Sequence, residues 1–291
     1  MDELLNSSEG LNRRRCIILG EIAERAGRYR DALSCSRRAI SKRFGTTSSM
    51  RSGTATEEEH GECLNPKDRK RLRLLLALAY RRIVEKHRRA LELSKTMFRK
   101  GGDKGLGGPK DHARDLLLKV CTDLDKDLSD MERIVALHAI PGNQRIEARS
   151  EVGAREKVEA TVFWSKMLGD CYRYRSEIQE DGERRRRTLD VAAEHYERAS
   201  DEASRSLKPT SSLRLGLAVN YASLLADASG DKKQAIRVAR AAWEDATAER
   251  HERTPKIIGK LLSFLNEKIR EWEAFSTTTT TTPGGRGHET T

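Results

Sequence analysis

The sequence predicts an all-α protein of about nine helices, in which successive helices run antiparallel. Apolar residues recur with the helical period along most of the chain, and no good run alternates with the strand period of two. Only six prolines occur among 291 residues, and aromatic residues make up 5% of the chain. The segments that separate the periodic stretches are mostly short, which is typical of antiparallel neighbours in a bundle or a solenoid. A chain of this length is long enough to bury a substantial core.

Each helix is expected between recognisable start and stop signals. Gly27 separates the first two helices, and Asn65-Pro66 supplies an N-cap and a first-turn proline for the long third helix. The glycine-rich stretch 101–109 ends the third helix, and Pro141-Gly142 follows the fourth. Pro209 precedes the seventh. The nine helices are expected at 11–27, 29–43, 66–99, 110–139, 152–179, 186–206, 211–229, 231–250 and 255–275.

The helical segments are expected to form a single domain over residues 11–275, preceded by a flexible N-terminus at 1–10. Residues 45–64 are rich in Ser, Thr and Gly and are interpreted as an insertion or loop. The tail 276–291 contains a run of threonines followed by Pro and Gly, and it cannot bury enough apolar surface to become ordered. We therefore expect the tail to be disordered.

The composition predicts a soluble protein of the cytosol. Charged residues make up 35% of the chain, and no stretch approaches 18 apolar residues. The polar start MDELLNSSEG is not expected to be a signal peptide. The five cysteines form no CxxC pair and are odd in number, which favours reduced thiols, and the histidines lack metal-ligand spacing. No metal and no other cofactor is expected.

The formal net charge of +11 raises nucleic acid as a partner. The densest basic runs are Arg13–Arg15 and Arg184–Arg187. Base-stacking aromatic residues are missing around both runs, so we interpret them as solvated helix ends or loops. A nucleic-acid interface is the less favoured interpretation.

The most informative segment is VFWSKMLGDCYRY, residues 162–174. In a helix, Lys166, Asp170, Arg173 and Tyr174 have the spacing i, i+4, i+7 and i+8, which places them on one face. An ammonium, a guanidinium and a phenol suit a doubly charged anion such as a phosphorylated side chain. No nucleophile or general base accompanies them, so the segment predicts a binding site and not an enzyme.

Two further segments carry polar residues at helical spacing. Arg81 and Arg88 are seven residues apart on one face of the third helix, and Asn220 interrupts an apolar stripe in the seventh. Asp227 lies two turns beyond Asn220. Each feature also has a structural interpretation: an exposed basic face for the two arginines and a satisfied buried amide for Asn220. Tyr174 alone would read as a core aromatic residue.

Together these segments resemble the 14-3-3 family. The resemblance rests on IAERAGRY at 22–29, the Tyr80–Arg89 segment, Phe163–Tyr174, Leu213–Asn220 and AWEDATAE at 242–249. It covers residues 11–275, with the helices in the order of that family. The resemblance implies an adaptor that binds phosphoserine or phosphothreonine segments of client proteins in a concave groove.

The resemblance assigns a role to most of the candidate residues. Arg88, Arg173 and Tyr174 match the residues that hold the phosphate, and Arg81 stands where the family usually has a lysine. Asp170 is expected to orient Arg173 or Lys166. The remaining residues of the predicted peptide site are Lys166 and Asn220 for the peptide backbone, Val219 and Trp272 for the wall, and Asp227.

Four further positions of the predicted peptide site and its surroundings depart from the family pattern. Glu92 replaces a frequent arginine, and Ser223 replaces an apolar residue of the wall. Lys268 and Glu271 stand where an asparagine and a leucine contact the peptide. We expect phosphate recognition to be retained and the preference for flanking residues to be altered.

A homodimer or heterodimer is expected, in a weakened or rearranged form. The resemblance places Ile22, Ala26, Arg28 and Asp31 at the dimer interface. The expected partners of Arg28 and Asp31 on the fourth helix are changed, because Leu116 and His112 stand where the family has an acid and a base. The chain's own tail is a further candidate ligand if Thr290 is phosphorylated.

Two alternatives to the phosphopeptide adaptor stay open. A divergent member of the family would serve as a helical scaffold whose binding ignores phosphorylation, although no fixed 34-residue period recurs. A basic helical protein would bind plain RNA with a steep salt dependence.

Overall fold

The computed structural model describes residues 13–41, 64–100, 109–139, 150–251 and 254–278. Within these ranges the chain forms nine α-helices and two short π-helical segments, and it forms no strand. The predicted all-α fold is therefore confirmed for this part of the chain. Two compact units, Met1–Glu156 and Lys157–Thr291, divide the chain. Each unit is described by itself.

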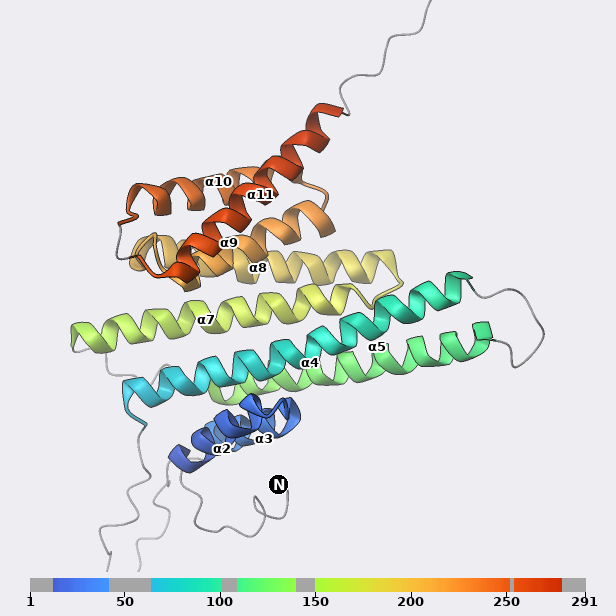
Figure 1. Ribbon diagram of the computed structural model, residues 1–291, viewed down its shortest axis with the longest axis horizontal. Helices are drawn as coiled ribbons and strands as arrows, with labels where there is room; N and C mark the ends of the chain where they lie inside the picture. The colour runs from blue at the N-terminus through green and yellow to red at the C-terminus, as the bar shows by residue number, and fades with distance from the viewer. Residues whose placement is uncertain (1–12, 42–63, 101–108, 140–149, 252–253, 279–291) are drawn as a thin grey trace, which may run out of the picture. The chain divides into compact units, whose positions relative to one another are not determined.

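The first unit contains a short helical hairpin and a pair of long antiparallel helices (Figure 1). The helices are α2 (Arg13–Arg25), α3 (Tyr29–Ser41), α4 (Pro66–Lys100), α5 (Pro109–Ile134) and η2 (Val135–Ala139), a π-helical continuation of α5. The turn between α2 and α3 requires Gly27, whose φ of 71° lies in the left-handed region. Asn65 caps α4, because its Oδ1 accepts a hydrogen bond of 2.9 Å from the amide of Asp68.

The core of the first unit joins α2, α3 and α4. Cys16, Ile17 and Cys35 are fully buried and pack against Leu72 of α4. A buried carboxylate, Asp127 of α5, accepts two hydrogen bonds from the Arg30 guanidinium at 3.0 and 2.9 Å. These contacts connect α3 to α5.

The second unit contains successive helices that reverse direction from one to the next (Figure 1). The elements are α7 (Glu151–Ser176), α8 (Gly182–Ser206), α9 (Ser212–Ser223), its π-helical continuation η3 (Leu224–Ala228), α10 (Lys232–Ala248) and α11 (Lys256–Thr278). The unit boundary falls inside α7, after Glu156.

Side-chain caps and one glycine set the helix starts of the second unit. Asp181 accepts a hydrogen bond of 2.5 Å from the amide of Arg184, and Asp231 accepts one of 2.9 Å from the amide of Gln234. Gly230, with a φ of 75°, forms the turn between η3 and α10. The helix predicted at 186–206 begins four residues earlier, at Gly182, because the Asp181 side chain caps its first turn.

Two clusters of buried side chains hold the second unit together. One cluster joins α7, α8 and α9 around the fully buried Tyr196, and alanines on α8 allow the close packing. The other joins α9, α10 and α11 and includes Ile258, Leu265 and Trp272. These clusters place the polar face of α7 against α8 and α9.

The other predicted helix bounds agree with the structure to within a few residues where these residues are described. The segment predicted as flexible at 1–10, the insertion up to residue 63 and the tail from residue 279 lie outside the described residues. Two edges of these segments differ from expectation: Leu64 is buried, and α11 continues to Thr278. Among the described helices, none has the length and apolar character needed to cross a membrane.

Candidate functional site

The polar face of α7 carries an ion pair that is mostly shielded from solvent. Lys166 Nζ lies 2.7 Å from Asp170 Oδ2, one helical turn away. The side chain of Asp170 is 11% exposed and that of Lys166 is 19% exposed. Lys166 and Asp170, which are four residues apart on one helix face, therefore contact each other.

Asp170 accepts hydrogen bonds from three helices. Besides Lys166 of α7, the hydroxyl of Tyr196 on α8 donates to Oδ1 at 2.5 Å. The Asn220 side-chain amide on α9 donates to the same oxygen at 2.6 Å. A buried carboxylate needs such donors to offset its lost hydration. Asp170 therefore fixes the register of α7, α8 and α9 at this point.

Arg173 connects to Asp170 through a tyrosine. Its Nε lies 3.4 Å from the Tyr196 hydroxyl, which itself donates to Asp170. The guanidinium carbon lies 4.3 Å from the centroid of the Tyr174 ring, a cation–π contact. Arg173 Nη1 also lies 3.8 Å from Glu177 Oε1. We name Lys166, Asp170, Arg173, Tyr196 and Asn220 the Asp170 cluster.

Burial and charge oppose each other at Asp170. Burial alone would raise the pKa of its carboxyl group, but the positive charges of Lys166 and Arg173 and the donated hydrogen bonds lower the pKa below its usual value. Asp170 is therefore a carboxylate at neutral pH.

Arg173 and Tyr196 also keep their protons at neutral pH. Burial disfavours the charged form of Arg173, but the neighbouring Tyr196, Tyr174 and Asp170 raise the pKa of its guanidinium. Burial, together with the charge of Asp170, raises the pKa of Tyr196 well above its usual value. The cluster thus presents two fixed cations and a neutral hydroxyl.

Gly169 provides the space for the Tyr196 ring. A Cβ atom added to Gly169 would lie 2.7 Å from Cε1 and 2.8 Å from Cδ1 of Tyr196. Real Cβ atoms do not approach a ring so closely, so any side chain here would displace the tyrosine. The glycine thereby permits the hydrogen bond between Tyr196 and Asp170.

The other predicted residues of the second unit lie around this cluster or apart from it. Val219 is half-buried and packs against the core of α9, α10 and α11, in which Trp272 is 5% exposed. Asp227 is exposed at η3 and contributes, after the Glu271 hydrogen bond and charge, to a raised pKa of Lys268. No contact to Asp170 is recorded for Asp227 among the described residues.

Arg81 and Arg88 belong to the first unit. Both are exposed on α4. They are seven residues apart, as predicted for one helix face. Glu92, one turn beyond Arg88, lies 3.9 Å from Lys95 Nζ.

The predicted dimer residues also belong to the first unit. Ile22 is 56% exposed on α2, and Ala26 is exposed in the turn that follows. Arg28 Nε lies 2.5 Å from Asp31 Oδ2 of the same chain. These two residues, which the resemblance assigns to a dimer interface, also contact each other within the chain.

Three residues of the site escaped prediction from the sequence: Tyr196, Gly169 and Glu177. Tyr196 lies on the buried stripe of α8 between Ala192 and Ala199, and a buried tyrosine hydroxyl usually requires a partner. That pattern could have identified Tyr196. Nothing in the sequence pattern indicates that Gly169 and Tyr196 touch, since they lie on different helices.

Comparison with known proteins identifies similar sequences. The family model described as 14-3-3 protein matches residues 19–273. The checkpoint signal transducer rad24 of Schizosaccharomyces pombe is 25% identical over 277 residues, which cover 94% of this chain and 90% of that protein. The 14-3-3 protein homolog 2 of Echinococcus multilocularis is 27% identical over 262 residues, covering 89% of this chain and 90% of that protein. The 14-3-3 family protein artA of Aspergillus flavus is 28% identical over 203 residues, which cover 69% of this chain and 80% of that protein.

Proposed function

Because the chain belongs to the 14-3-3 family of adaptor proteins, we propose that it binds phosphoserine or phosphothreonine segments of client proteins through the Asp170 cluster. Arg173 and Tyr174 contact the phosphate in this proposal, and Lys166 and Asn220 hold the peptide backbone. Val219, Trp272 and Asp227 border the same site. The resemblance in sequence extends the proposal to Arg81 and Arg88.

The observation that carries the proposal is the fixation of Arg173. Its guanidinium is held by the Tyr196 hydroxyl, the Tyr174 ring and Glu177, and 17% of its side chain is exposed. A cation that is already immobilised loses little conformational entropy when an anion arrives. A solvated arginine on a helix surface would lose more.

The expected selectivity follows from the energy of charge-assisted hydrogen bonds. Each contributes about 1.5–3 kcal/mol. Two such bonds to a phosphate correspond to a preference of at least ~100-fold over the unphosphorylated peptide, because about 1.4 kcal/mol changes affinity tenfold. The presence of Lys268 and Glu271 favours a changed preference for the residues that flank the phosphate.

Fluorescence anisotropy with a phosphoserine peptide and its unphosphorylated twin tests the proposal. We expect saturable binding of the phosphopeptide alone and its loss in Arg173→Glu. Arg185→Glu, a charge reversal at an exposed position of α8, is the matched control and should bind nearly as well as the wild type. Equal binding of both peptides would instead support the phosphate-independent scaffold.

A second variant tests the contribution of the first unit. If Arg88 and Arg173 bind one phosphate, the loss in Arg88→Glu/Arg173→Glu should be smaller than the sum of the single losses. If the losses in binding free energy of the two single variants add up to that of the double variant, Arg88 and Arg173 do not bind the same phosphate.

A further inference from the structure

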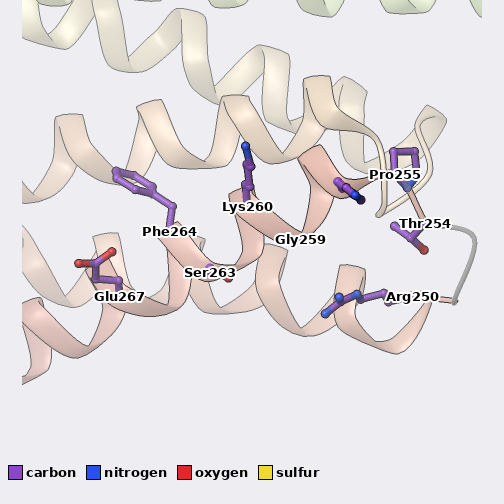
Figure 2. Close-up of a pocket in the computed structure, with 9 residues that line it drawn as sticks. Arg250, Thr254, Pro255, Gly259, Lys260, Ser263, Phe264 and Glu267 are labelled. Carbon is purple, nitrogen blue, oxygen red and sulfur yellow. The ribbon is translucent and has the colours of Figure 1, made fainter.

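A second cationic site lies where α10 is joined to α11, and it shares no residue with the Asp170 cluster. The structure has an open hollow of about 700 Å³ there. Figure 2 shows that its lining comes from Arg250, which follows α10, and from residues 254–267, which include the start of α11. The lining residues are Arg250, Thr254, Pro255, Lys256, Gly259, Lys260, Ser263, Phe264 and Glu267.

Three of the lining residues are cations, and all three lie between residues 250 and 260, around the start of α11. Arg250 comes from the residues after α10, and Lys256 and Lys260 are one turn apart on α11. The first turn of α11 contains no acidic residue, and Glu267 lies nearly two turns beyond Lys260. Within the ranges that the structure describes, none of the three cations has a carboxylate at salt-bridge distance.

The hollow is bordered by groups whose positions are fixed. The amide of His251 donates to Thr254 Oγ1 at 3.0 Å, and the amide of Thr254 donates to the carbonyl of His251 at 2.9 Å. The Arg250 Nη2 atom lies 3.7 Å from the position of a Cβ atom on Gly259, so the guanidinium lies against the start of α11. The hydroxyls of Thr254 and Ser263 add polar groups to the lining.

Clustered cations repel one another, and a bound anion removes this repulsion. Side chains one helical turn apart have Cβ atoms about 5–6 Å from each other. One phosphate group can therefore contact both lysines, and a ligand with a second phosphate group can also reach towards the Arg250 guanidinium, which lies against Gly259. The volume lies within the roughly 300–1,000 Å³ typical of small-molecule sites.

We propose that the hollow between α10 and α11 binds a small anion that carries two or more phosphate groups. This site is independent of the phosphopeptide site, so both can be occupied at once. The ligand chemistry is shared by inorganic oligophosphates and by phosphorylated small metabolites. Tripolyphosphate and inorganic monophosphate serve as the probes.

Isothermal titration calorimetry of the Arg173→Glu protein with tripolyphosphate tests the proposal with the phosphopeptide site disabled. We expect one saturable site with a dissociation constant at least tenfold lower than that for monophosphate. Lys260→Glu and Arg250→Glu should each weaken tripolyphosphate binding at least tenfold. Arg270→Glu, which is exposed on α11 outside the hollow, should change it less than twofold.

Two results would overturn the proposal. The first is an equal loss in Arg270→Glu and Lys260→Glu, which would assign the binding to the net charge of the protein. The second is the absence of saturable binding when circular dichroism shows that the protein is folded.

The phosphopeptide assay separates this proposal from the proposed function. Lys260→Glu should bind the phosphoserine peptide like the wild type if the two sites are distinct. A parallel loss of phosphopeptide and tripolyphosphate binding in Lys260→Glu would contradict a separate site. If the phosphopeptide binds neither the wild type nor any variant, the proposed function is wrong. The tripolyphosphate titration then still decides whether the hollow binds anions.

Discussion

The hydroxyl of Tyr196 on α8 donates a hydrogen bond of 2.5 Å to Asp170 on α7. The same hydroxyl lies 3.4 Å from Arg173 Nε, so one tyrosine connects the buried carboxylate to the guanidinium. Gly169 leaves the room that the tyrosine ring requires. This arrangement makes the position of Arg173 depend on a residue of another helix.

Removing the Tyr196 hydroxyl should weaken phosphopeptide binding without removing a charge. In Tyr196→Phe, Arg173 loses its link to Asp170, and one oxygen of the buried carboxylate loses a donor. We expect a loss of about 1–2 kcal/mol in binding, roughly five- to thirtyfold. Fluorescence anisotropy with a labelled phosphopeptide measures the affinities of Tyr196→Phe and of the wild type.

Tyr221→Phe is the matched control for this substitution. The Tyr221 ring centroid lies 5.9 Å from that of Tyr196, and no hydrogen bond of its hydroxyl is recorded within the described residues. Its removal should leave affinity within about twofold, since nothing in the site depends on it. Equal effects of both substitutions would refute the role assigned to the Tyr196 hydroxyl.

A methyl group at position 169 should destabilise the second unit. Gly169→Ala places Cβ within 3.0 Å of three Tyr196 ring atoms, and we expect a loss of about 1–3 kcal/mol in the free energy of unfolding. Gly216→Ala on α9 meets no atom within 4 Å and should be neutral or stabilising by up to about 1 kcal/mol. Urea denaturation distinguishes the two. Two variants of equal stability would mean that the ring has room to move.

The contribution of Asp170 to stability should depend on pH. Its pKa is lowered in the folded protein, so its stabilising contribution is complete above the unfolded value of about 3.9. That contribution is lost as pH falls below about 4 towards the folded pKa. Asp170→Asn should be less stable than the wild type at pH 7 by about 1–3 kcal/mol, and the difference should narrow below pH 4.

Urea unfolding of both proteins between pH 7 and pH 3 measures this difference. Asp227→Asn, which changes an exposed carboxylate of η3, is the control and should follow the wild type at every pH. A gap between Asp170→Asn and the wild type that stays constant down to pH 3 would show that the charge of Asp170 is not what stabilises the cluster.

Glu177 should limit phosphate affinity. Its Oε1 lies 3.8 Å from Arg173 Nη1, so a bound phosphate competes with it for the guanidinium. In Glu177→Gln we expect phosphopeptide affinity to rise about two- to fivefold, as a partly solvated ion pair contributes up to about 1 kcal/mol. Titration of both proteins with the phosphopeptide at low and high salt measures this change. If Glu177→Gln and the wild type bind the phosphopeptide equally well at low salt, Glu177 does not compete with the phosphate.

The dissociation constant of a dimer should be above about 1 μM if Arg28 and Asp31 stay paired within one chain. Their contact of 2.5 Å uses the groups that the family resemblance assigns to a partner subunit. Sedimentation velocity over a concentration series measures the association, and Ile22→Glu should reduce it further because Ile22 is exposed on α2. A dimer that persists at nanomolar concentration would contradict the prediction.

The amino-acid sequence alone was sufficient to predict the helices, their order and the family. Helical periodicity, Asn65-Pro66 and the glycine-rich stretch 101–109 act locally, so they can be recognised without knowing the fold. The spacing of Lys166 and Asp170 likewise predicted a contact within one helix, because residues four apart lie on the same face.

The tertiary structure alone decided which residues from different helices meet. Tyr196 and Asn220 converge on Asp170, and Gly169 leaves room for the Tyr196 ring, because α8 and α9 pack against α7 in one register. That register depends on core contacts between residues distant in sequence. Local patterns determine which groups a helix carries, whereas packing determines what those groups contact.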